Sequence, residues 1–139
     1  MTDKPTLSGF LVRVQDLLAI NKPQEALEVI AKSRLESPAA KNARAVCLLR
    51  MDQVQPATAI LRELLFPRDS ISPSPDVPAI FYTNYVTAML MQGNLTAATG
   101  ILAQVPDKKH PAVLRLRETL QQWRGTLGIG WRMLSFLGF

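Results

Sequence analysis

Residues 43–66 decide the fold, and they read ARAVCLLRMDQVQPATAILRELLF. Apolar residues recur at helical spacing through Ala43–Met51 and again through Pro56–Phe66, so two helices are predicted here. The second helix carries its apolar residues on one face: Ala57, Ile60, Leu61 and Leu64. Only Asp52–Gln55 separate the two helices, and helices joined by so short a turn pack as antiparallel neighbours.

Similar helix pairs are predicted on both sides of this unit. The first pair turns at Asn21-Lys22-Pro23 and stops near Ser37-Pro38, and the third turns at Gly93-Asn94. A seventh helix follows them. We therefore expect a repeat domain over residues 1–125, with hairpins at about 8–37, 40–66 and 77–106, a capping helix at 111–124, and then an apolar segment at 126–139.

A proline-rich segment separates the second pair from the third. Residues 67–78 hold prolines at positions 67, 73, 75 and 78, with serines between them. Prolines at this density interrupt both helices and sheet pairing. We expect an exposed loop that contributes no residue to the core.

The composition agrees with an all-α fold. Apolar residues make up 47% of the 139 residues, which is enough to form a core, and glycine is scarce. A lone cysteine, Cys47, excludes an internal disulfide and a cysteine-based zinc cage. Residues 1–21 do not read as a signal peptide, and no apolar run is long enough for a membrane-spanning helix. A cytoplasmic location is expected, with peripheral membrane association as the alternative.

The three helix pairs share a sequence register. Each second helix has a small residue followed four positions later by a large apolar one: Ala26 with Ile30, Ala57 with Leu61, and Ala98 with Leu102. Nine residues before each alanine lies another large apolar residue: Leu17, Leu48 and Met89. The alanine lets two helices approach closely, and the larger side chain fills the gap beside it. In this pattern, residues 8–106 resemble the tetratricopeptide repeat (TPR) family, as a divergent member.

The resemblance implies a right-handed array of antiparallel helical hairpins, a TPR-like α-solenoid, with 111–124 as its capping helix. The sequence also departs from the family pattern. No repeat has the family's glycine, and Arg13 and Arg44 replace its leucine. The alanines are spaced 31 and 41 residues apart, whereas the family repeat is about 34 residues long. A generic three-hairpin bundle or another helical repeat is therefore the alternative.

The resemblance also implies a function. TPR proteins bind an extended or helical peptide in a concave groove lined by the first helix of each hairpin, so we expect a non-catalytic adaptor or scaffold with a protein or peptide partner. The exposed groove candidates are Gln15, Asn42, Arg50, Thr83, Asn84 and Thr87. Their apolar floor is Leu11, Leu18, Val46, Leu49 and Leu90. Alternatively, many of these side chains simply pack between helices.

No set of residues points to catalysis, a metal or a cofactor. His110, the only histidine, lies in a Lys-Lys-His-Pro turn, where capping a helix is its ordinary role. Cys47 lies within a helix between apolar neighbours, as buried structural thiols do. The glycines at 125, 128 and 130 follow a helix and not a strand, so they do not match a phosphate-binding loop. We expect a non-enzyme without a cofactor.

The C-terminal arm combines positive charge with apolar residues. Residues 1–107 are neutral overall, whereas 108–139 carry the whole net charge of +5. Apolar residues crowd the end, among them Trp131, Met133, Phe136 and Phe139. This segment either folds back as a last capping element, docks on a partner or a second copy, or lies at a membrane surface. Nucleic-acid binding is not expected, because the cations are spread out and no reader motif accompanies them.

Overall fold

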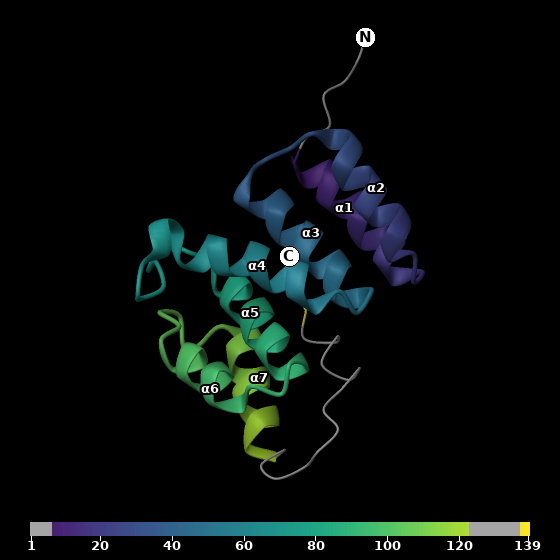
Figure 1. The fold of residues 1–139 in the computed structure, drawn as a ribbon. Helices are drawn as coiled ribbons and strands as arrows, with labels where there is room; N and C mark the ends of the chain where they lie inside the picture. The colour runs from purple at the N-terminus through teal and green to yellow at the C-terminus, as the bar shows by residue number, and fades with distance from the viewer. Residues whose placement is uncertain (1–6, 123–136) are drawn as a thin grey trace.

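The chain folds into seven α-helices joined by turns and one longer loop, as the computed structural model shows for residues 7–122 and 137–139. The helices are α1 (Leu7–Ala19), α2 (Pro23–Ser33), α3 (Pro38–Arg50), α4 (Val54–Leu65), α5 (Ala79–Met91), α6 (Leu95–Ala103) and α7 (Pro111–Gln122), with a short 3-10 helix, η1 (Pro67–Asp69), after α4. Helices α1 to α5 each pack against the next one along the chain, and α7 packs against α5 (Figure 1). The expected all-α domain of adjacent helix pairs is confirmed.

The turns inside the three pairs share one backbone geometry. Each contains a residue with positive φ, which is 59° at Asn21, 61° at Asp52 and 76° at Gly93. The following residue then donates its N–H to a carbonyl five positions back, over 2.8–2.9 Å: Lys22 to Leu17, Gln53 to Leu48 and Asn94 to Met89. This is the Schellman ending of a helix, in which a left-handed residue reverses the chain and satisfies free carbonyls.

The three alanines of the sequence register lie at equivalent places after these turns. Ala26, Ala57 and Ala98 each follow the left-handed residue by five positions, and each is completely buried. Their predicted burial is confirmed. The first helices of the pairs also contact one another, α1 with α3 and α3 with α5, so they form one row along the molecule.

The boundary between the first two pairs differs from the prediction. Helix α2 ends at Ser33, where Arg34 takes the left-handed conformation, so Ser37 and Pro38 do not end it. They begin α3 instead: Pro38 is its first residue, and the Ser37 Oγ accepts a hydrogen bond from the Ala40 N–H at 3.3 Å. Serine suits the N-cap because its hydroxyl oxygen accepts a hydrogen bond from a free N–H of the first turn. Proline suits the first turn because the N–H that it lacks would have no partner within the helix.

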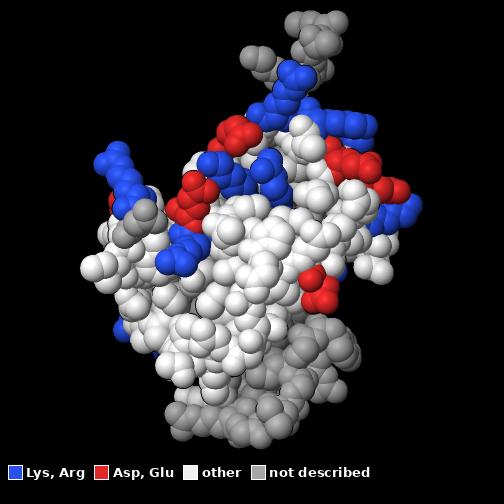
Figure 2. Space-filling model, in the orientation of Figure 1, with Lys and Arg blue, Asp and Glu red and all other residues white. Residues whose placement is uncertain are grey.

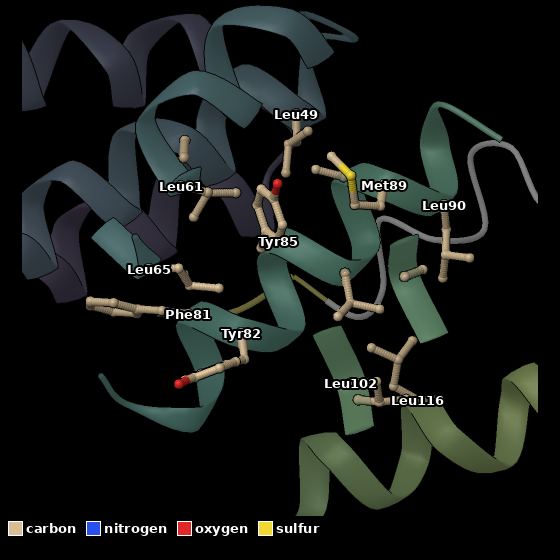
Figure 3. Packing of buried hydrophobic residues seen from close by; sticks show 14 of the residues in the cluster. Leu49, Leu61, Leu65, Phe81, Tyr82, Tyr85, Met89, Leu90, Leu102 and Leu116 are labelled. Carbon is tan, nitrogen blue, oxygen red and sulfur yellow. The ribbon is translucent and has the colours of Figure 1, made fainter. Parts of the chain in front are cut away.

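Helix α5 lies at the centre of the fold and is buried on all sides. Ten consecutive residues, 81–90, are buried, because α3, α4, α6 and α7 all pack against this helix. Figure 3 shows Tyr85 and Met89 near Leu49 and Leu61 of the second pair, whereas Leu102 and Leu116 of α6 and α7 meet on another side. A helix that is buried all round is typical of the interior of a domain.

The proline-rich loop is tied to the core at its end. The Tyr82 hydroxyl donates to the Ser74 carbonyl at 2.7 Å, and the Ser74 N–H donates to the Leu65 carbonyl at 2.8 Å. Val77 is partly buried against the core. The expectation that residues 67–78 contribute nothing to the core is therefore wrong at Val77. Ile71, at the middle of the loop, is fully exposed, as predicted for the loop as a whole.

Charged side chains are unevenly distributed over the surface. Between residues 70 and 106 the sequence has one charged residue, Asp76, so α5 and α6 carry none. In Figure 2 most charges accordingly gather toward the end formed by the first two pairs, and a broad neutral face lies below them. Within the described ranges, no helix has the length and apolar character needed to cross a bilayer.

Candidate functional site

Two buried asparagines lie side by side on the row of first helices. Asn42 belongs to α3 and Asn84 to α5, and both side chains are completely buried. The Asn84 Nδ2 donates a hydrogen bond to the Asn42 Oδ1 at 2.8 Å. Burying an amide is costly unless its hydrogen bonds are made, so these two side chains require partners at this position.

The remaining hydrogen bonds of this pair go to the main chain of Gly138. The Gly138 N–H donates to the Asn84 Oδ1 at 2.8 Å, and the Gly138 carbonyl accepts from the Asn84 Nδ2 at 2.5 Å. The Asn42 Nδ2 donates to the same carbonyl at 3.1 Å. A side-chain amide has the donor and acceptor of a peptide group, so Asn84 pairs with Gly138 as a neighbouring strand would. We call Asn42 and Asn84 the asparagine clamp.

The residues beside Gly138 add apolar contacts. Leu137 packs against both hydrophobic clusters of the core, and Phe139 packs against the cluster built on α1, α2 and α3. A pocket of about 210 Å³ adjoins them, and its walls are Gln15, Leu18, Ala19, Val46 and Arg50, together with residues 137–139. The site is therefore a groove along α1, α3 and α5 with a chain segment already lying in it.

Arg50 lies at the edge of this groove with an unsatisfied donor. Its Nε is buried and has no hydrogen-bond partner among the described residues. A buried donor left without a partner costs about 1–3 kcal/mol. An acceptor supplied by a bound segment would offset that cost.

The six predicted groove residues fall into three pairs. Gln15 is exposed and Arg50 is half-buried, and both line the pocket beside residues 137–139. Asn42 and Asn84 form the clamp. The other two are satisfied by their own helix: Thr83 donates to the Ile80 carbonyl at 3.0 Å and Thr87 to the Thr83 carbonyl at 2.7 Å.

The predicted exposure of these residues needs a correction. Asn42, Thr83, Asn84 and Thr87 were expected to be exposed, and all four are completely buried. The reason is that α5 is enclosed by its neighbours and the clamp is covered by Gly138. Of the predicted apolar floor, Leu18, Val46, Leu49 and Leu90 are buried and Leu11 is half-buried.

The C-terminal segment can be assessed at its last three residues. Trp131, Met133 and Phe136 lie outside the described residues. Residues 137–139 do fold back onto the helices, as one of the three alternatives expects. They lie over α3 and α5, because the clamp holds Gly138 there, and Phe139 is partly buried.

Two residues of the site were missed in the sequence. The sequence places Gly138 only within an apolar run, and Ile80 is not among the predicted groove residues. A Cβ atom placed on Gly138 would lie 2.7 Å from the Ile80 Cδ1 and 3.0 Å from its Cγ1. No sequence signal relates positions 54 and 96 residues apart, as Asn84 and Asn42 are from Gly138.

His110 and Cys47 have the ordinary roles expected of them. The His110 Nδ1 accepts a hydrogen bond from the Ala112 N–H at 3.1 Å, so this side chain caps the start of α7. Cys47 is completely buried, and burial raises the pKa of its thiol to about 12. Among the described residues, no three histidine, cysteine or carboxylate side chains come together as a metal site.

The fold and the groove define an all-α domain of seven sequentially packed helices, counted over residues 7–122, with a segment of its own chain held on one face. Comparison of the chain with protein-family models, with curated proteins and with solved structures finds no match. The functional interpretation therefore rests on the residues of the groove.

Proposed function

We propose that this chain is a non-catalytic adaptor that binds a peptide or partner helix along the face of α1, α3 and α5. We further propose that its helix pairs are divergent TPR-like repeats of an α-solenoid. The recurrence of one turn geometry, with a buried alanine five residues after each left-handed residue, supports the repeat.

The observation that carries the proposed function is the pairing of Asn84 with both main-chain groups of Gly138. Every residue except proline has these groups, so this hydrogen bonding does not itself depend on the side chain of the bound residue. Two buried amides at this place are costly unless a chain segment satisfies them. A groove with such a clamp, an unsatisfied Arg50 Nε and apolar walls supports peptide binding.

A membrane-associated adaptor was the alternative, and the groove-binding function is favoured over it. Leu137 and Phe139 belong to the apolar run on which membrane attachment depends. Both pack against the helices and are partly buried. Apolar surface that packs in the groove is not available to a lipid surface.

Site-specific crosslinking in cells of the native host tests the proposed function. A photo-crosslinking amino acid replaces Gln15 at the groove, and in a matched variant it replaces Thr99, which is exposed on α6. We expect a discrete protein partner to crosslink from position 15 and not from position 99. The purified partner should then bind less tightly to Gln15→Ala/Arg50→Ala, while Thr99→Ala binds it as the wild type does. Crosslinking from position 99 alone, or from neither position, contradicts the proposal.

A further inference from the structure

The groove has no free space for a side chain at the position that Gly138 occupies. A Cβ atom there would lie 2.7 Å from the Ile80 Cδ1 and 3.0 Å from its Cγ1, so the Ile80 side chain would have to shift before one could fit. Ile80 and Asn84 are four residues apart on α5, so they lie on the same face of that helix. Asn84 bonds to the main chain of Gly138, and Ile80 fills the space that a side chain at position 138 would need.

The positions on either side of Gly138 take large apolar side chains. Leu137 packs against both core clusters, which it joins across the groove, and Phe139 packs against the cluster that includes Phe10 and Val46. Contact with apolar walls stabilises such side chains in proportion to the area removed from water. The groove therefore accepts three consecutive residues by different means: apolar contact, main-chain pairing without a side chain, and apolar contact again.

We propose that the groove selects segments in which a glycine lies between two large apolar residues, and that residues 137–139 are the chain's own copy of this ligand. This proposal rests on the proposed function and names the class of peptide that the groove takes. A partner segment of the same chemistry binds by displacing Leu137, Gly138 and Phe139 from the clamp.

An internal ligand lowers the apparent affinity for an external one. A segment tethered to the same chain competes at an effective concentration of about millimolar. The apparent dissociation constant equals the intrinsic one divided by the fraction of molecules whose groove is free, so it rises as the internal segment fills more grooves. Weakening the internal segment should therefore strengthen peptide binding, whereas weakening the groove should reduce it.

The test measures fluorescence anisotropy of a labelled peptide with the sequence of residues 134–139, Leu-Ser-Phe-Leu-Gly-Phe, closed by an amide. A second peptide has alanine in place of its glycine. Both are titrated with the full chain as the wild type and as Gly138→Val, in which the internal segment no longer fits beside Ile80. Circular dichroism shows whether the helices are kept.

We expect Gly138→Val to bind the glycine peptide about tenfold or more tightly than the wild type does, because its groove is free of competition. In this variant the alanine peptide should bind at least about tenfold more weakly than the glycine peptide, the usual effect of one misplaced methyl group. Adding Ile80→Ala should remove this difference, because the space for the methyl group is then open.

Three outcomes overturn the inference. Equal affinity of the Gly138→Val variant for the two peptides shows that the groove does not select glycine. Equal affinity of the wild type and Gly138→Val for the glycine peptide shows that residues 137–139 do not compete. A wild-type dimer in sedimentation that Gly138→Val dissociates assigns the groove to the segment of a second copy. Crosslinking of a partner at Gln15 can succeed whichever result is found, so failure here is distinguishable from failure of the proposed function.

Discussion

Replacing Asn84 with alanine tests whether the asparagine clamp holds the C-terminal segment. The side chain makes three hydrogen bonds, one with Asn42 and two with Gly138. Its removal leaves the Asn42 Oδ1 buried without its donor, which costs about 1–3 kcal/mol. The two Gly138 groups are half-buried and regain water in part, so each lost bond contributes about 0.5–1.5 kcal/mol at most. We expect Asn84→Ala to lower the free energy of unfolding by about 2–4 kcal/mol.

Two matched variants separate the clamp from the general effect of losing a buried polar group. Asn42→Ala should cost less, about 1–2 kcal/mol, because the Gly138 carbonyl keeps its shorter bond to Asn84. Thr87→Val, one turn further along α5, removes a hydroxyl that bonds only within its helix, and it should cost no more than about 1 kcal/mol. The double variant of Asn42 and Asn84 should cost less than the sum of the two single ones, because the pair shares a hydrogen bond.

Urea unfolding followed by circular dichroism measures these free energies, and hydrogen exchange of the Gly138 amide reports on the clamp directly. That N–H donates to the Asn84 Oδ1, so its exchange should accelerate in Asn84→Ala and remain slow in Thr87→Val. A loss of stability below about 0.5 kcal/mol, the size of an ordinary surface substitution, together with unchanged Gly138 exchange, would refute the clamp.

Four further predictions concern the core and the start of α7. Ala57→Leu should lower the free energy of unfolding in urea by about 1–3 kcal/mol, because Ala57 is completely buried. Ala59 is exposed on the same helix, so Ala59→Leu should be nearly neutral. Equal effects of the two substitutions would contradict the register of the helix pairs. Burial raises the pKa of the Cys47 thiol from 9.0 to about 12. This thiol should therefore resist a thiol reagent at pH 8 until the protein unfolds. Prompt labelling of the native protein would contradict its burial. The unfolded chain loses the thiol proton of Cys47 at lower pH than the folded chain does, so the free energy of unfolding should fall as pH rises from 9.0 toward 12. Cys47→Ala should not show this part of the decrease. His110→Ala should cost about 0.5–2 kcal/mol by removing the acceptor for the Ala112 N–H, and an unchanged urea midpoint contradicts the cap.

Local sequence patterns were sufficient for the helix pairs. Helical spacing of apolar residues, prolines at helix starts and residues that tolerate positive φ act over a few positions, so the sequence predicts them directly. The same holds for the buried alanines Ala26, Ala57 and Ala98, because one register relates each to its own turn. The error at Ser37-Pro38 is also local, since proline either follows one helix or opens another.

The candidate site could be predicted only in part. The resemblance placed Gln15, Asn42, Arg50 and Asn84 on the row of first helices, and the structure brings all four to the groove that residues 137–139 occupy. Their exposure could not be predicted, because burial depends on which elements cover a face. Thr83 and Thr87 lie on α5, whose neighbours leave none of residues 81–90 exposed.

The sequence by itself determined the all-α class, the helix pairs and the burial of one alanine in each pair, because short-range geometry decides these features. Only the tertiary structure decided that Asn42, Asn84 and Gly138 meet and that Ile80 closes the space beside the glycine. These residues are up to 96 positions apart, and a hydrogen bond forms only when folding brings its two atoms to about 3 Å. Polar side chains such as these can be assigned to a groove only once the packing of the helices is known, because the packing decides which chain segment they bond to.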